Sequence, residues 1–371
     1  MAAHPRHRRI LYMQTQTQLR IKNYMTKQDI KSMLPEELKD YFESIGERAF
    51  RAGQVFRWLH NGARTFGEMT DLPETLRIRL ENEFTLVVPE ILEKQVSRLD
   101  GTVKYLWRLW DGNTVESVVM DNKYGFTICI STQVGCRMGC VFCASAIGGL
   151  IRDLKPSEML DQVQFLQMDI GKRISNIVLM GIGEPLDNFE NVMRFLTLIN
   201  HPAGMNIGQR HITLSTCGIL EMIDKLAEYD IQSSLAVSLH APDDETRSRL
   251  MPINRKTGVD RLLRTCAMYA SKTGRRVSYE YALISGVNDT PRHAEILAKK
   301  LKNTGSHLNL ILLNNVPERA FQPSSPMSVK AFTGFLKKSG VNFTVRRRLG
   351  GDIDASCGQL RGKKHGTLGN N

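Results

Sequence analysis

The chain has 371 residues, of which 42% are hydrophobic and 24% are charged. These are ordinary globular proportions, and no apolar run approaches the roughly 20 residues of a membrane-spanning helix, so we expect no membrane association. The formal net charge of +12 fits a polyanionic partner such as RNA, but a merely basic enzyme fits it equally well.

Residues 1–24 are predicted to be a flexible N-terminal extension. Its first basic residues are followed by the polar run Gln14 to Gln18 instead of an apolar segment, which argues against a secretory signal. The chain also has seven cysteines, and clustered thiols in a reducing compartment more often bind metal or react than form structural disulfides. Both observations predict a cytoplasmic protein.

Residues 25–95 are predicted to form a small helical domain, since apolar residues recur there at helical spacing. Its arginines Arg48, Arg51, Arg57 and Arg64 either face RNA or form a solvated surface, and the sequence favours neither. The predicted helices are Leu34–Ile45, Ala49–His60 and Leu72–Phe84.

Residues 96–361 are predicted to form a second domain of the α/β class, and residues 362–371 a basic flexible tail. Alternating strands and helices imply parallel strands with right-handed crossovers, hence a closed or partial barrel with its active site at the C-terminal strand ends. The predicted strands are Thr102–Leu109, Thr114–Met120, Phe126–Ser131, Ser175–Met180, Ile212–Thr216, Ser233–Ser238, Val277–Ile284, Leu308–Leu313 and Asn342–Val345. The predicted helices are Ser157–Met168, Phe189–Asn200, Leu220–Tyr229, Val259–Ser271, Pro291–Lys302 and Val329–Ser339.

The strand Phe126–Ser131 leads into a glycine-punctuated loop with the cysteine spacing CxxxCxxC, at Cys136, Cys140 and Cys143. Three thiolates from one loop can hold three irons of a 4Fe–4S cluster and leave the fourth iron open to the methionine moiety of S-adenosylmethionine. A zinc site is the alternative, but it would need a fourth ligand that the nearby sequence does not offer. The pattern favours a cluster that cleaves S-adenosylmethionine into a radical.

Polar residues follow several predicted strands. The turn Gly183-Glu184-Pro185 comes one helix after the cysteine loop, which favours a functional role over an ordinary turn. Each of the others could equally well satisfy loop backbone. The candidates for binding the cofactor are Gly183, Glu184, Ser215, Ser238, Leu239, His240 and Asn314.

A glycine-rich segment near the C-terminus presents Cys357 after three arginines, Arg346 to Arg348. A lone cysteine is usually inert packing. Here the polar neighbours argue against an apolar core, and the guanidinium groups would favour the thiolate.

Together these motifs resemble the RlmN/Cfr family of radical adenine methyltransferases. The three-cysteine loop and the Gly-Glu-Pro turn resemble those of the wider radical S-adenosylmethionine superfamily, whereas Cys357-Gly-Gln-Leu is specific to this family. The resemblance covers about residues 30 to 361. It implies a partial (β/α)6 barrel preceded by a strand extension, a small N-terminal helical domain that binds RNA, and a cofactor site at the residues named above.

The resemblance also implies roles for Cys357, Cys129 and Glu116. Cys357 takes a methyl group from one S-adenosylmethionine. A second molecule yields the deoxyadenosyl radical that removes hydrogen from this S-methyl group, and the resulting radical adds to adenine. Glu116 accepts a proton, and Cys129 attacks the Cys357 sulfur, which leaves a transient disulfide. Without the resemblance, Glu116 would be expected to face solvent, and Cys217 and Cys266 are interpreted as core residues.

The implied substrates are rRNA and tRNA, methylated at C2 of an adenosine in the large-subunit rRNA and of the adenosine 3′ of the anticodon. Methylation at C8, which confers antibiotic resistance, is the alternative, and the motifs do not separate the two. An electron donor such as flavodoxin or ferredoxin and a monomeric state are further expectations. A non-enzymatic iron–sulfur RNA-binding protein would leave Cys357, Glu184 and Cys129 unexplained.

Overall fold

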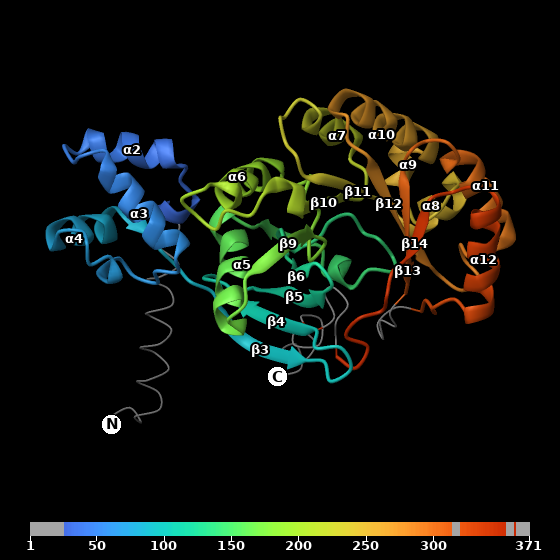
Figure 1. Ribbon diagram of the computed structural model, residues 1–371, viewed down its shortest axis with the longest axis horizontal. Coiled ribbons are helices and arrows are strands. Elements are labelled where there is room, and N and C mark those ends of the chain that lie inside the picture. Colours follow the sequence, from blue (N-terminus) through green and yellow to red (C-terminus); the bar gives the residue numbers. More distant parts are fainter. Residues whose placement is uncertain (1–25, 314–319, 354–359, 361–371) are drawn as a thin grey trace, which may run out of the picture.

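The computed structural model describes residues 26–313, 320–353 and 360. The predicted N-terminal extension and basic tail therefore lie outside the described residues. Figure 1 shows a helical module at the N-terminal side and an α/β domain whose helices are layered against one large sheet. In the described part of the chain, no helix is both long enough and apolar enough to cross a membrane.

Among the described residues, the N-terminal module has three α-helices, and they confirm the three predicted ones. Pro35 opens the first helix, where its missing N–H leaves no hydrogen bond unmade. The second helix buries Val55, Phe56 and Leu59 at helical spacing. The elements are α2 (Pro35–Ser44), α3 (Phe50–His60) and α4 (Glu74–Glu83), and the short strands β1 (Gln28–Asp29) and β2 (Phe84–Thr85) pair in parallel and join the two ends of the module.

The module docks on the α/β domain through polar side chains that are themselves buried. Lys31 forms an ion pair with Asp161 and donates to Gln164, and the Lys31 and Asp161 side chains are each only 2% exposed. Beside them, the Ser157 hydroxyl donates to the Asp29 carboxylate. An unpaired buried charge is costly, so these pairs favour one docked arrangement.

The α/β domain contains a ten-stranded sheet with the strand order β14-β13-β12-β11-β10-β9-β6-β5-β4-β3. Strands β3 to β6 are antiparallel, and the strands from β6 to β14 are parallel neighbours. The strands are β3 (Glu90–Val96), β4 (Val103–Arg108), β5 (Thr114–Asn122), β6 (Gly125–Cys129), β9 (Ile174–Leu179), β10 (Ile212–Thr216), β11 (Ser234–Ser238), β12 (Val277–Leu283), β13 (His307–Leu312) and β14 (Phe343–Val345).

Each parallel strand from β6 to β13 is followed by at least one helix, and β14 and β3 end the sheet without pairing with each other. This confirms the α/β class and the partial (β/α)6 barrel with an antiparallel strand extension. The helices are α5 (Pro156–Ile170), α6 (Phe189–Asn200), α7 (Leu220–Leu226), α8 (Asp244–Leu250), α9 (Asn254–Thr257), α10 (Val259–Thr273), α11 (Pro291–Leu301) and α12 (Pro326–Lys338).

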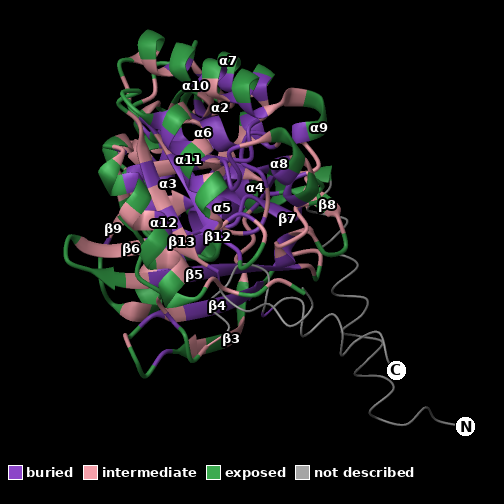
Figure 2. Ribbon diagram, turned by 90° about the vertical axis from the view of Figure 1, so that its right-hand side faces the viewer, coloured by how far each residue is buried: buried purple, intermediate pink, exposed green. Residues whose placement is uncertain are grey.

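The two faces of the sheet differ in polarity. The outer face is apolar and packs under the helices, and Ile128, Leu214 and Val237 on it are fully buried or nearly so. Figure 2 shows that much of this layer between sheet and helices is buried. Paired residues on neighbouring strands point to the same side, and the register pairs Ser238 with Glu280 and Cys129 with Val178. We call the opposite side the inner face; it carries Glu116, Cys129, Ser215, Ser238, Glu280 and Asn309.

The structure adds elements that the sequence did not indicate. Strand β3 joins the main sheet by pairing with β4, so the sheet begins at Glu90, before the predicted boundary between residues 95 and 96. Helices α8 and α9 fill the predicted gap before α10. A hairpin of β7 (Gln133–Gly135) and β8 (Leu150–Asp153) encloses the cysteine loop.

Candidate active site

The inner face opens onto a cavity of about 320 Å³ at the C-terminal ends of the parallel strands. Most of the predicted ligand and cofactor residues line it, together with Cys217 and Glu280, to which the sequence assigned no binding role. Its walls include Cys136, Cys140, Cys143, Gly183, Glu184, Ser215, Cys217, Ser238, His240 and Glu280.

Of the predicted site residues that the structure describes, three are not on this cavity wall. The Leu239 side chain is fully buried in the hydrophobic core, as its place opposite Ser238 and His240 along the strand requires. Glu116 and Cys129 are buried elsewhere on the inner face. Asn314 lies outside the described residues, as does Cys357.

The hairpin of β7 and β8 folds the cysteine loop back over the cavity. The Cys136 N–H donates to the Gly149 carbonyl at 3.0 Å, and the Cys143 N–H donates to the Cys140 carbonyl at 3.2 Å. Gly135 has φ 82°, and a Cβ added there would lie 2.0 Å from the Gly149 oxygen. The strands can approach this closely only because residue 135 is glycine.

The donor set fits a 4Fe–4S cluster, since three thiols from one loop line the same cavity. Burial raises the pKa of the Cys136 thiol to about 12 and also raises the pKa of Cys140, so bound iron would have to displace these protons. Within the described ranges, no three His, Cys, Asp or Glu side chains are close enough together to share one metal ion, whereas a 4Fe–4S cluster takes one thiolate on each of three irons.

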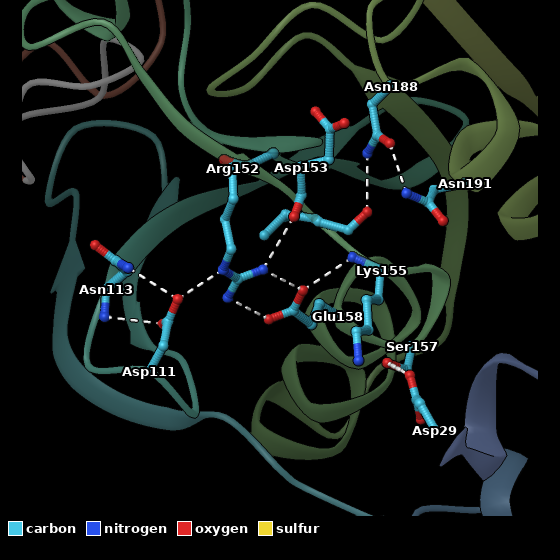
Figure 3. Close-up of polar contacts among 12 residues, drawn as sticks. Asp29, Asp111, Asn113, Arg152, Asp153, Lys155, Ser157, Glu158, Asn188 and Asn191 are labelled. Carbon is cyan, nitrogen blue, oxygen red and sulfur yellow. Dashed lines mark hydrogen bonds and ion pairs between the residues drawn. The ribbon is translucent and has the colours of Figure 1, made fainter. Parts of the chain in front are cut away.

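A polar network fixes the base of the hairpin (Figure 3). Both terminal nitrogens of Arg152 donate to the Glu158 carboxylate at 2.8 Å, and its Nε donates to Asp111 at 2.6 Å. On the other side, the Asn188 amide donates to the Leu154 carbonyl at 2.8 Å. Because the network joins β8 to helix α5 and to the β4–β5 turn, the cysteine loop starts from a fixed frame.

Glu184 presents a buried carboxylate beside the cysteines. Its Oε2 accepts the Cys217 N–H at 2.7 Å and its Oε1 accepts the Leu186 N–H at 3.1 Å. Burial raises the pKa of Glu184. The preceding Gly183 has φ 114°, and a Cβ there would lie 2.7 Å from Gln133. A carboxylate held this way can bind the ammonium group of an amino acid.

His240 is a neutral hydrogen-bond donor. Its Nδ1 accepts the Ala282 N–H at 2.9 Å, and burial lowers its pKa to about 3. A neutral imidazole whose Nδ1 accepts carries its proton on Nε2. The ring also meets the edge of Phe142, whose centroid is 4.9 Å away, so the cysteine loop and the strand end support each other.

Two charged residues of the site went unnoticed in the sequence. Arg247 is fully buried and donates to the carbonyls of Cys217, Ser238 and Leu239 at 2.8 to 3.0 Å. The residues around it, from Asp243 to Arg249, are all charged or polar, so nothing in the sequence signalled its burial. Glu280 lines the cavity, and alternation along its strand could have placed it beside Ser238.

In the part of the chain that the structure describes, only one of the two carboxylate oxygens of Glu280 accepts hydrogen bonds. Its Oε1 accepts from Asn309 and from Arg346, both at 2.9 Å. Its Oε2 is buried and has no hydrogen-bond partner among the described residues. Within the described ranges, Glu280 therefore keeps one acceptor oxygen unused.

Glu116 is buried, so the solvent-facing alternative is wrong. The residue is 3% exposed, and its Oε2 lies 2.8 Å from Nζ of the fully buried Lys104. The Ser131 hydroxyl donates to its backbone carbonyl at 2.7 Å. Cys129 is buried on the next strand, beside Val118.

Two family models match the chain. Residues 28–86 match the "Ribosomal RNA large subunit methyltransferase N-terminal domain", and residues 130–297 match the "Radical SAM superfamily". The first match ends before β3, which agrees with that strand's place in the main sheet.

Similar curated proteins extend over most of the chain. "Probable dual-specificity RNA methyltransferase RlmN" of Alkaliphilus metalliredigens (strain QYMF) is 50% identical over 339 residues, 91% of this chain and 96% of that protein. The protein of the same name from Clostridioides difficile (strain 630) is 48% identical over 334 residues, 90% of this chain and 97% of that protein.

A solved structure is also similar. It is the crystal structure of a radical SAM methyltransferase from Sphaerobacter thermophilus, with a TM-score of 0.85 and 40% identity. The alignment covers 90% of this chain and 98% of that one.

Proposed function

The chain belongs to the RlmN family of radical S-adenosylmethionine RNA methyltransferases, and we propose that it methylates C2 of an adenosine in the large-subunit rRNA and of the adenosine 3′ of the anticodon in tRNA. One observation carries this proposal: three thiols of one loop and the buried Glu184 carboxylate meet on one cavity. The relatives named dual-specificity RNA methyltransferases favour two RNA substrates. Methylation at C8 is the competing regiochemistry.

Different residues of the cavity bind the 4Fe–4S cluster and S-adenosylmethionine. Cys136, Cys140 and Cys143 hold a 4Fe–4S cluster, which supplies the electron for reductive cleavage of S-adenosylmethionine. Glu184 pairs with the ammonium group of the methionine moiety. Gly183 allows the close backbone packing that holds Glu184 in place. His240 donates from Nε2 to an acceptor of the bound nucleoside or carboxylate.

The remaining contacts to S-adenosylmethionine come from strand ends. The hydroxyls of Ser215 and Ser238 lie on the cavity wall and can donate or accept hydrogen bonds. Leu239 contributes only backbone, because its side chain belongs to the core. Asn314 follows β13 and completes the set.

The acceptor chemistry belongs to Cys357, Cys129 and Glu116. Cys357 thiolate takes a methyl group from S-adenosylmethionine by displacement. After this carbon has been joined to adenine, Glu116 accepts the proton that the ring carbon loses. Cys129 thiolate then attacks the Cys357 sulfur, so that an S–S bond forms and the sulfur–carbon bond breaks. The electron pair leaves with the carbon, which a proton converts into the methyl group of the product.

The electrons balance over one turnover. Forming the disulfide releases two electrons, and reductive cleavage of one S-adenosylmethionine to deoxyadenosine and methionine consumes two. A thiol reductant returns Cys129 and Cys357 to their starting state. Two S-adenosylmethionine molecules are used for each methyl group transferred.

The partners follow from the charge and from the N-terminal module. Arg48, Arg57 and Arg64 are exposed on this module, and we assign them to RNA phosphates. A flavodoxin or ferredoxin supplies electrons to the cluster, and the chain acts as a monomer.

Release of deoxyadenosine tests the radical activity. The protein is reconstituted anaerobically with iron and sulfide, reduced, and given S-adenosylmethionine. Wild-type protein should release deoxyadenosine, and Cys136→Ala should bind less iron and release none. Cys266→Ala is the matched control, because Cys266 is buried in the core away from the cavity, and it should retain release. No release by cluster-loaded wild type, or unchanged release by Cys136→Ala, would overturn the proposal.

A further inference from the structure

A lysine is fully buried inside the sheet, next to the candidate proton acceptor. Lys104 lies on β4, its side chain is 0% exposed, and its Nζ is 2.8 Å from Glu116 Oε2. Removing an ammonium and a carboxylate from water carries a large penalty that pairing seldom more than offsets. An apolar pair of similar size would serve folding at least as well, so stability alone is a poor reason for this ion pair.

The strand register explains why the two side chains meet. Lys104 is paired with Val118 and Leu106 with Glu116, so Lys104 and Glu116 are diagonal neighbours on the inner face. Diagonal positions are roughly 7–8 Å apart, a span that a lysine side chain bridges. Val118 is paired on its other side with Cys129. The ion pair therefore lies one strand away from the cysteine assigned to resolve the RNA adduct.

Glu116 is held at both ends. Lys104 fixes its carboxylate through Oε2, and the Ser131 hydroxyl fixes its backbone carbonyl at 2.7 Å. We propose that Lys104 is a positioning residue that holds the Glu116 carboxylate, as its anion, where the ring carbon of adenine loses its proton. This inference rests on the role proposed for Glu116.

The position predicts at which step Lys104 acts. Neither Lys104 nor Glu116 lines the cavity that carries the cysteines and Glu184. Methylation of Cys357 and cleavage of S-adenosylmethionine therefore should not depend on the pair, whereas release of methylated RNA should. Loss of Lys104 should leave the covalent protein–RNA adduct waiting for proton removal.

The experiment compares Lys104→Met and Lys104→Arg in the reconstituted full-length enzyme, with an RNA transcript and S-adenosylmethionine. Lys104→Met should form methyladenosine about a hundredfold more slowly, the usual range for losing general acid–base catalysis. Its Cys357 methylation and its first turnover of deoxyadenosine should stay within about twofold of wild type, and the adduct should accumulate on a denaturing gel. Lys104→Arg, which keeps the charge, should recover much of the rate.

Lys31→Met is the matched control for burial. Lys31 also forms a buried ion pair, with Asp161, but at the docked N-terminal module. It should lose stability to a similar degree without accumulating adduct. A uniform decrease in all steps in both variants would show that Lys104 is only structural.

A double substitution separates action through Glu116 from an independent effect. Lys104→Met combined with Glu116→Gln should be no slower than Glu116→Gln alone, because a positioning residue has nothing left to position. If the two losses multiply, the inference is wrong. If wild type methylates RNA and Lys104→Met methylates it equally fast, the inference about Lys104 fails and the proposed function stands. If wild type methylates no RNA, the proposed function fails.

Discussion

Gly135 decides whether the cysteine hairpin can close. The atom nearest to an added Cβ is the backbone oxygen of Gly149, at 2.0 Å. A backbone atom cannot rotate out of the way as the end of a flexible side chain could. Gly148, in the same loop, also has a positive φ, of 85°, but no described atom lies within 4 Å of its added Cβ. Substituting each glycine in turn therefore distinguishes the effect of a steric clash, present only at Gly135, from that of backbone strain, present at both.

Gly135→Ala should therefore prevent cluster assembly. We expect iron and labile sulfide per chain to fall at least about tenfold, because the clash adds to a left-handed strain of roughly 1–2 kcal/mol. Gly148→Ala carries only that strain and should retain most of its iron. Equal iron contents in the two variants would show that closure of the hairpin is not what positions the thiols.

Single residues were predictable where they end strands or repeat at a ligand spacing. Cys136, Glu184 and His240 come from different elements, and the expectation that strand ends meet brings them to one cavity. Arg247 was not predictable, because its burial depends on carbonyl groups that meet only in the folded chain. Cys357 lies outside the described residues, so its role remains a prediction.

At the scale of elements, helix α3 carries a buried histidine that lowers the stability of the folded state at low pH. His60 is buried, stacks on Phe56 with ring centroids 4.1 Å apart, and neither of its ring nitrogens has a partner among the described residues. Burial lowers its pKa to about 3. The folded state therefore keeps His60 neutral where an unfolded chain would protonate it.

Stability should fall as the solution is acidified from pH 7 to pH 5. Between the unfolded pKa of about 6.5 and the folded value, only the unfolded chain takes up this proton, which costs about 2 kcal/mol by pH 5. His60→Phe should remove this part of the pH dependence and keep the stacked ring. Urea denaturation of both proteins at the two pH values measures it, and an unchanged pH dependence in the variant would contradict the assignment.

Element positions were largely predictable because most helices and strands bury one apolar side. The predicted Phe189–Asn200 and Ile212–Thr216 coincide with α6 and β10. Strand β3 was missed because residues on both of its faces are exposed or half-buried, which removes the alternation. Helices α8 and α9 are short and rich in charged residues, so they lack an apolar stripe.

For the whole molecule, the alternation of strands and helices was enough to predict a partial barrel, since right-handed crossovers allow few other topologies. The docking of the N-terminal module was not predictable. It depends on Lys31 meeting Asp161 across 130 positions of sequence, and charged residues give no sign of burial. The same holds for Lys104 and Glu116.

At the scale of the whole molecule, the net charge of +12 and the exposed arginines of the N-terminal module both favour a polyanionic substrate. RNA is such a substrate, and it would also bring the adenosine to the cavity. The proposed function requires that this molecule place a methyl group on C2 of adenosine. Mass spectrometry of nucleosides from rRNA and tRNA, in cells with and without the protein, tests it most directly. We predict that 2-methyladenosine disappears from both RNAs without the protein and returns with wild type but not with Cys357→Ala. Unchanged 2-methyladenosine, or loss of 8-methyladenosine in its place, would show that the protein does not methylate C2.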